Sequence, residues 1–120
     1  MIQGRHCEME YQEIFPINRG DLEKMVESGN KKAIVDALLS AAYYDPDWRW
    51  VQGLCLRFLD HSDRNVRWIA ATCLGHLARI HRDLDLELVL PKLLEMKKDP
   101  LVAPSVEEAL DDIHFFLRIN

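Results

Sequence analysis

The residues of this sequence that could bind a transition metal or act as a nucleophile are five histidines and three cysteines. They are His6, His61, His76, His81 and His114, with Cys7, Cys55 and Cys73. No two histidines are four residues apart and no Cys-x-x-Cys pair occurs, so the spacings typical of zinc sites are missing. His6 and Cys7 are adjacent and could interact, but a cysteine without a placed acid or oxyanion donor is usually inert. The sequence therefore predicts no catalytic residues, no metal site and no cofactor.

Glycine and cysteine are expected to serve packing in this chain rather than chemistry. The five glycines are scattered and form no phosphate-binding loop, and we expect Gly53 and Gly75 to be close-packing points between helices. Cys55 and Cys73 fall on apolar helix faces, so we expect them to be buried thiols rather than partners in a disulfide.

Length and composition describe one soluble domain. The chain has 120 residues, of which 48% are hydrophobic and 29% charged, as in ordinary globular proteins. No apolar run approaches the roughly 20 residues of a membrane span, and the first residues lack the hydrophobic core of a signal peptide. Together with the odd number of cysteines, this predicts a cytoplasmic protein. The net charge of −5 argues against general nucleic-acid binding and is compatible with a basic protein partner.

Apolar residues recur at helical spacing along most of the chain. In the central stretch they form one helix face that Asp63 is placed to cap, and no stretch alternates with a period of two. Pro91 is expected to kink the helix that contains it. The sequence predicts an all-α fold with six helices. The first is a short helix for which Asn18 and Asp21 are possible caps, and it ends where Gly29 is free to turn left-handed. The second is capped by Asn30, others cover 47–59, 63–82 and 86–97, and the last follows a turn at 98–100 and runs to about residue 117.

An internal period of 36 residues relates these helices. A forward shift of the central helix by 36 positions superposes like residues: Asp63 on Asp99, Val66 on Val102, Ala70 on Val106, Leu74 on Leu110 and Leu77 on Ile113. The reverse shift places Ala70 on Ile34 and Leu74 on Leu38. Each unit is then a helix, a polar turn and a longer helix, and such hairpins need neighbours to bury their apolar faces.

Two of these units resemble HEAT repeats, which belong to the armadillo-like families. Residues 88–102 carry the mid-helix proline and the Asp-Pro turn, and residues 63–75 carry the Asp-Arg-Asn-Val-Arg, Ala-Ala and Leu-Gly groups of that repeat. The resemblance implies an α-α superhelix of about three stacked hairpins, in which Asp63 and Arg67 join neighbouring turns. The domain would span residues 1–120, with an N-terminal arm over 1–18 and repeats over 19–44, 46–82 and 84–117. The first unit departs from the pattern because it lacks the Val-Arg pair.

The surface opposite the core stripe is the predicted partner-binding site. In HEAT-like stacks the second helix of each pair lines the concave side, which implies a groove rich in aromatic and charged side chains. That mixture is enriched at protein-binding hot spots. The predicted partner-binding residues are Tyr43, Trp68, Thr72, Arg79, Glu108, Asp111 and Phe115. The competing interpretation is that the aromatic residues pack against the arm or a neighbouring helix.

Charge is distributed unevenly along the repeats. Residues 64–82 contain four arginines and no acidic residue, whereas residues 99–120 contain five acidic residues and only Arg118. Two solvated faces would give the same pattern. As a functional feature, the acidic end would suit a partner rich in lysine or arginine.

Two classes of function fit these features. The first is a non-enzymatic protein-binding module; its sharper form is similar to the small bacterial immunity proteins that neutralise toxins, often basic nucleases, by direct binding. The alternative is a HEAT-fold enzyme or ligand carrier, similar to DNA alkylpurine glycosylases or bilin lyase subunits, with Trp68, Arg79 and Asp111 at its concave site. A regulatory subunit of a larger assembly is a third option. The predicted partner is therefore another protein, such as a basic toxin domain, rather than a membrane or nucleic acid.

Overall fold

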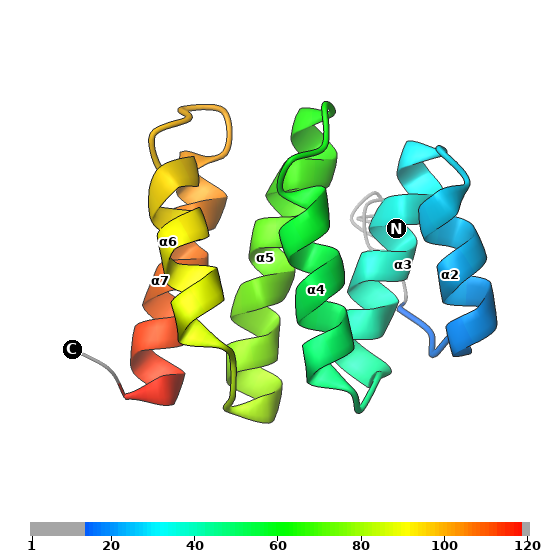
Figure 1. Cartoon of the computed structure of the whole chain (residues 1–120), viewed down its shortest axis with the longest axis horizontal. Helices are drawn as coiled ribbons and strands as arrows, with labels where there is room; N and C mark the ends of the chain where they lie inside the picture. The colour runs from blue at the N-terminus through cyan, green and yellow to red at the C-terminus, as the bar shows by residue number, and fades with distance from the viewer. Residues whose placement is uncertain (1–13, 119–120) are drawn as a thin grey trace, which may run out of the picture.

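The computed structural model describes residues 14–118, and all regular secondary structure in that range is α-helical. Consecutive helices pair into three hairpins that stand side by side, α2 with α3, α4 with α5 and α6 with α7 (Figure 1). This arrangement confirms the predicted all-α fold of stacked hairpins. The helices are α2 Arg19–Glu27, α3 Lys31–Tyr44, α4 Trp48–Phe58, α5 Arg64–His81, α6 Leu86–Met96 and α7 Ala103–Leu117.

Short polar side chains set the beginnings of four helices. Asn18, Asn30, Asp47 and Asp63 each accept a hydrogen bond from a backbone N–H in the first turn of the helix that follows, which satisfies a donor without an intrahelical partner. The predicted caps Asn18, Asn30 and Asp63 are thereby confirmed. Gly29 has a φ of 77°, the left-handed conformation that the turn between α2 and α3 was predicted to need.

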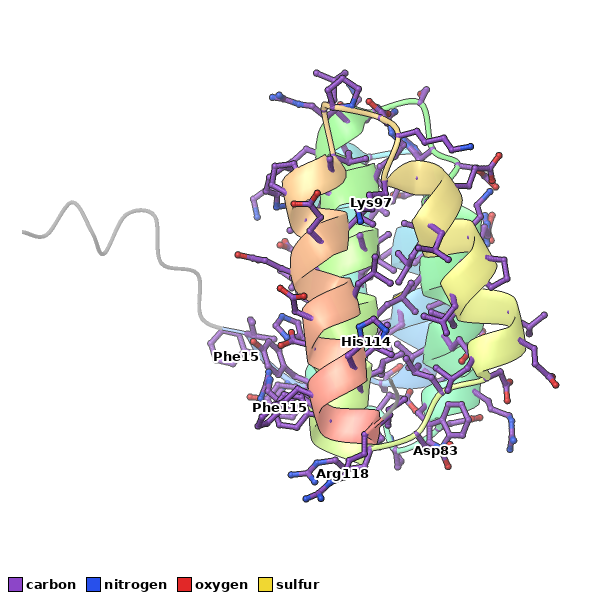
Figure 2. The ribbon with its side chains drawn as sticks, turned by 90° about the vertical axis from the view of Figure 1, so that its left-hand side faces the viewer. Phe15, Asp83, Lys97, His114, Phe115 and Arg118 are labelled. Carbon is purple, nitrogen blue, oxygen red and sulfur yellow. The ribbon has the colours of Figure 1, made fainter. Side chains whose placement is uncertain are left out.

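The six helices form two layers. The second helices of the hairpins, α3, α5 and α7, pack on one another and make the inner layer, while contacts between successive first helices α2, α4 and α6 are sparser. Figure 2 looks along the stack and shows the inner helix α7 on one side and the outer helix α6 on the other. The inner layer is therefore the more tightly packed one.

Small residues let the inner helices approach closely. Gly75 of α5 is buried, and a Cβ atom there would lie 3.2 Å from the Cα of Ala109 in α7, so its predicted packing role is confirmed. The same prediction was wrong for Gly53, which is exposed on the outer helix α4 with no atom within 4 Å of such a Cβ. Cys55 and Cys73 are buried free thiols, as predicted, whereas Cys7 lies outside the described residues.

Ion pairs between hairpins repeat with the same period as the helices. Lys31 Nζ lies 3.4 Å from an oxygen of Asp63, and Arg67 Nη2, one repeat later, lies 3.5 Å from an oxygen of Asp99. Arg67 also donates hydrogen bonds of 3.0 Å to the carbonyl oxygens of His61 and Ser62. These contacts place Asp63 and Arg67 between neighbouring units, where the repeat resemblance expected them.

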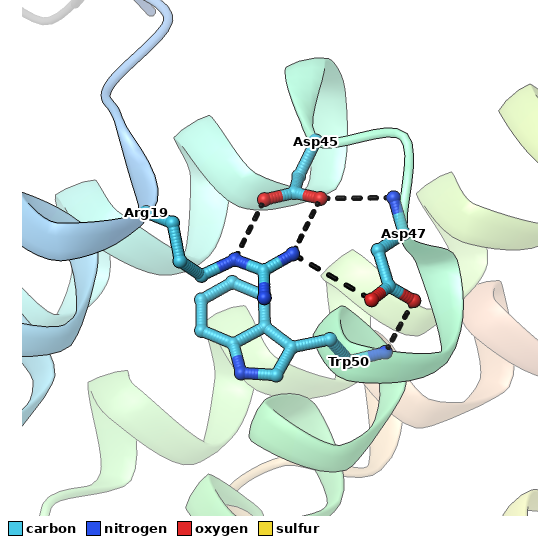
Figure 3. A network of polar contacts seen from close by, with 4 residues as sticks. All are labelled: Arg19, Asp45, Asp47 and Trp50. Carbon is cyan, nitrogen blue, oxygen red and sulfur yellow. Dashed lines mark hydrogen bonds and ion pairs between the residues drawn. The ribbon is translucent and has the colours of Figure 1, made fainter.

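An ion-pair network links the start of α2 to the turn between α3 and α4. The guanidinium of Arg19 is 3.2 Å from Asp45 and 3.6 Å from Asp47, and it stacks over the Trp50 ring at 3.8 Å (Figure 3). Of the predicted N-terminal arm, the structure describes residues 14–18 only. That part lies along α3.

Candidate protein-binding surface

The predicted partner-binding residues occupy equivalent positions on the three inner helices. The 36-residue period relates Tyr43 of α3 to Arg79 of α5 and to Phe115 of α7. It also relates Thr72 to Glu108. All were expected to line one concave groove. The structure instead gives them different surroundings, because each helix of the stack has a different neighbour.

On α5, two of the predicted residues take part in the contact with α7. The hydroxyl oxygens of Thr72 and Ser105 are 2.9 Å apart, and Ser105 donates a second hydrogen bond of 2.7 Å to the carbonyl oxygen of Trp68. The Trp68 side chain is half-buried and packs against the core. Thr72 is thus engaged within the protein, and the Trp68 ring is only partly available to a partner.

Tyr43 and Arg79 form a cluster with His76 between α3 and α5. The Tyr43 and His76 rings stack with centroids 4.9 Å apart, and the Arg79 guanidinium lies 5.8 Å from the Tyr43 ring centre. Arg79 Nη2 is also 3.1 Å from Nδ1 of His76, which can accept a hydrogen bond because the ring is neutral. Burial, with a smaller contribution from the Arg79 charge, lowers the pKa of His76 from 6.5 to about 4. Tyr43 therefore packs against a neighbouring helix, as the competing interpretation expected, and its role in binding a partner stays a prediction.

Asp112 of α7 occupies the position equivalent to His76. One of its carboxylate oxygens would lie 3.0 Å from a Cβ added at Gly75, so it faces α5. Burial raises the pKa of Asp112, and the nearby Arg79 charge opposes that shift. Asp112 and Arg79 thus bring opposite charges to the junction of the second and third hairpins.

Glu108, Asp111 and Phe115, which we call the α7 edge, are all exposed. Thr72 and Gly75, the α5 equivalents of Glu108 and Asp111, face α7. However, α7 is the last helix of the described stack, and no later helix there packs on it. Phe115 is 73% exposed and packs edge-on against Phe116, with ring centroids 4.8 Å apart. Figure 2 shows Phe115 projecting on the same side of the molecule as Phe15, away from α6. The α7 edge is therefore exposed and is not covered by any other helix of the described residues.

His76, Asp112 and Phe15 were not among the predicted site residues. A signal for two of them exists in the sequence: contacts between hairpins recur 33 positions apart, as in the Gln52–Asp85 and Thr72–Ser105 hydrogen bonds. The same spacing relates Tyr43 to His76 and Arg79 to Asp112. This spacing of 33 residues is shorter than the 36-residue repeat, because the side chain in contact lies about one helical turn before the equivalent position on the next helix.

Two further observations apply to residues 14–118. No three His, Cys, Asp or Glu side chains in this range are grouped so that they could hold a metal ion. None of the six helices has the length and apolar character that crossing a membrane would require.

Comparison with solved structures shows a clear similarity. A chain in the crystal structure of the CDI complex from Cupriavidus taiwanensis LMG 19424 is 38% identical to this chain, with a TM-score of 0.81. The match covers 88% of this chain and 96% of that chain. No protein-family model matches the sequence, so membership of the HEAT family stays a resemblance, and no curated protein matches it either.

Proposed function

Because the chain belongs to the same protein family as that chain of the Cupriavidus taiwanensis CDI complex, we propose that it is an immunity-type protein that neutralises a toxin by binding it directly. CDI denotes contact-dependent inhibition, a toxin–immunity system. The observation that carries the proposal is this match, since 38% identity over nearly the full length of both chains supports a shared kind of partner. The inhibitor acts without chemistry of its own.

We place the main contact at the α7 edge. Phe115 supplies a large apolar ring that is already exposed, and an aromatic anchor buried on binding is typical of an interface hot spot. Glu108 and Asp111 flank it on the same face of α7 and supply charge for a polar rim. The Tyr43–His76–Arg79 cluster, with Trp68 further along α5, provides a second contact on the inner layer.

The charge of this region argues for a basic toxin surface. Residues 99–120 carry five acidic side chains against one arginine, within a chain of net charge −5. Complementary potentials accelerate encounter and select orientation, and exposed pairs of this kind are screened by salt. The toxin, which we expect to be a nuclease, would be held with its basic surface against α7 and thereby kept from its substrate.

The test is co-expression of the full chain with the toxin domain encoded by the adjacent gene. We expect the two proteins to co-purify as a stable complex, the association rate to fall as salt is raised, and cells that produce the toxin domain to grow only when this chain is present. A toxin domain that remains fully active with an excess of this chain, and does not co-purify with it, would refute the proposal.

A further inference from the structure

A hollow of about 250 Å³ lies between the N-terminal segment and the first hairpin. Its apolar walls come from Ile14, Phe15 and Ile17 of the segment, Met25 of α2 and Leu39 of α3. This volume is below the roughly 300 Å³ at which small-molecule sites begin, so the hollow suits a single long side chain.

Two hydrogen bonds hold the N-terminal segment of the hollow against α3. The Ser40 hydroxyl donates to the carbonyl oxygen of Phe15 at 2.6 Å, and the Tyr44 hydroxyl donates to the carbonyl oxygen of Ile14 at 2.9 Å. Ile17 packs against the core below. The segment is therefore tied to α3 by two donors, and the hollow is part of the fold.

One carboxylate interrupts the apolar lining. Asp36 of α3 lines the hollow, and its side chain is 37% exposed. Its Oδ2 pairs with Lys32 Nζ at 2.9 Å, but the Lys32 side chain is 70% exposed, so the pair is weak and readily rearranged. Among the described residues, no hydrogen bond reaches the second oxygen, Oδ1, which can therefore accept one from a partner.

The chemistry of this lining selects its occupant. A purely apolar side chain would strip water from the Asp36 carboxylate without replacing its hydrogen bonds, which is unfavourable. An acidic side chain would be repelled. An arginine meets both requirements, because its aliphatic stem covers the apolar walls while its guanidinium bonds to the carboxylate and can lie against the Phe15 ring.

We propose that the hollow formed by residues 14–17, α2 and α3 is a socket for one arginine side chain of the toxin. This inference rests on the proposed function. Phe15 is 62% exposed and lies on the same side of the molecule as Phe115 (Figure 2), so a partner that covers the α7 edge and the inner layer reaches the socket as well. The toxin is thereby held at both ends of the stack.

The socket is tested first without any toxin, by NMR titration of the isotope-labelled full chain with butylguanidinium and with its neutral analogue butylurea. Butylguanidinium should bind saturably in the millimolar range and shift the amides of Asp36, Leu39 and Ser40, about fivefold more tightly than butylurea. Asp36→Asn should abolish that preference, Lys32→Met should increase affinity by removing the competing cation, and Glu95→Gln, on the exposed face of α6, should change nothing. Equal affinity for the two compounds, or an unchanged preference in Asp36→Asn, overturns the socket.

A second measurement separates this inference from the proposed function. With the toxin domain as titrant, Asp36→Asn should weaken binding about tenfold relative to Glu95→Gln. If the wild-type chain binds the toxin domain and the two variants match it, the socket is wrong and the proposed function stands. If butylguanidinium binds the socket but the wild-type chain does not bind the toxin domain, the proposed function is wrong.

Discussion

Positions that are equivalent in the 36-residue repeat are covered by a neighbouring helix on α5 but exposed on α7. On α5 they hold Thr72, which hydrogen-bonds across to α7, and Gly75, which is buried against Ala109. On α7, 36 residues later, they hold Glu108 and Asp111, which are exposed. A side chain between two hairpins contributes to stability, whereas the equivalent side chain at the end of the stack is available to a partner. The two helices should therefore respond to substitution in different assays.

The largest expected effect is on stability, at Gly75. Gly75→Val adds a branched side chain where even a Cβ would approach the Cα of Ala109 to 3.2 Å, so the inner helices must move apart. We expect a loss of about 3 kcal/mol in the free energy of unfolding, measured with urea. Asp111→Ala, at the equivalent position of α7, should change that free energy by less than about 0.5 kcal/mol. Equal effects of the two substitutions would remove the distinction between packed and free positions.

The next effect is on binding, at Phe115. Phe115→Ala removes the exposed ring proposed as the anchor and should weaken toxin binding by about 2 kcal/mol, roughly 30-fold, with almost no change in stability. Calorimetry or surface plasmon resonance measures the affinity.

The matched control for Phe115 is Leu94→Ala. Leu94 is also a large exposed hydrophobic residue, 53% accessible, but it lies on the outer helix α6. Its loss should leave affinity unchanged. If Leu94→Ala weakens binding and Phe115→Ala does not, the interface lies on the outer layer.

A smaller effect is expected from acid, through His76. Its pKa in the folded protein is lowered from 6.5 to about 4, so between these values the unfolded chain binds the proton and the folded chain does not. The stability that comes from the neutral ring is present above pH 6.5 and is lost as the pH falls towards 4, by about 1 kcal/mol once partial exposure is allowed for. Urea unfolding at several pH values measures this slope.

The variant His76→Gln should flatten that slope, because it removes the group that titrates. His114→Gln, a change at an exposed histidine of α7, should retain the wild-type slope. Identical slopes for the two variants would mean that the packed histidine does not control the acid response.

The smallest effect has the opposite sign. Gly53 lies in the middle of α4 with open space around it, so Gly53→Ala should gain helix propensity without a clash. We expect an increase of about 0.5–1 kcal/mol in the free energy of unfolding, seen as a higher melting temperature. A loss of stability would indicate a close neighbour at this position.

Much of the fold could be predicted because its causes are local. Asn30 and Asp63 begin helices by hydrogen bonds to residues three positions ahead, and Gly29 ends one by its own conformational freedom. The repeat also follows from the chain, since a period of 36 must bring like faces of successive hairpins into register. Gly53 and Gly75 illustrate the limit, because both are glycines within helices and only the neighbour across the gap distinguishes them.

The candidate site could be predicted only in part, for a related reason. Helical periodicity gives the angle at which Tyr43, Thr72 or Phe115 leaves its helix, but not whether another helix stands there. That depends on where each hairpin lies in the stack, which decided that Thr72 meets Ser105 while Phe115 faces solvent.

The amino-acid sequence by itself thus determined the helices, their ends, the spacing of the repeats and the acidic character of the last one. The tertiary structure decided which of the repeated positions are covered and brought Asp36 together with the N-terminal segment. The physical reason is how far along the chain the interactions reach. Caps and helix faces depend on residues a few positions away, whereas burial depends on contacts between helices that are distant along the chain.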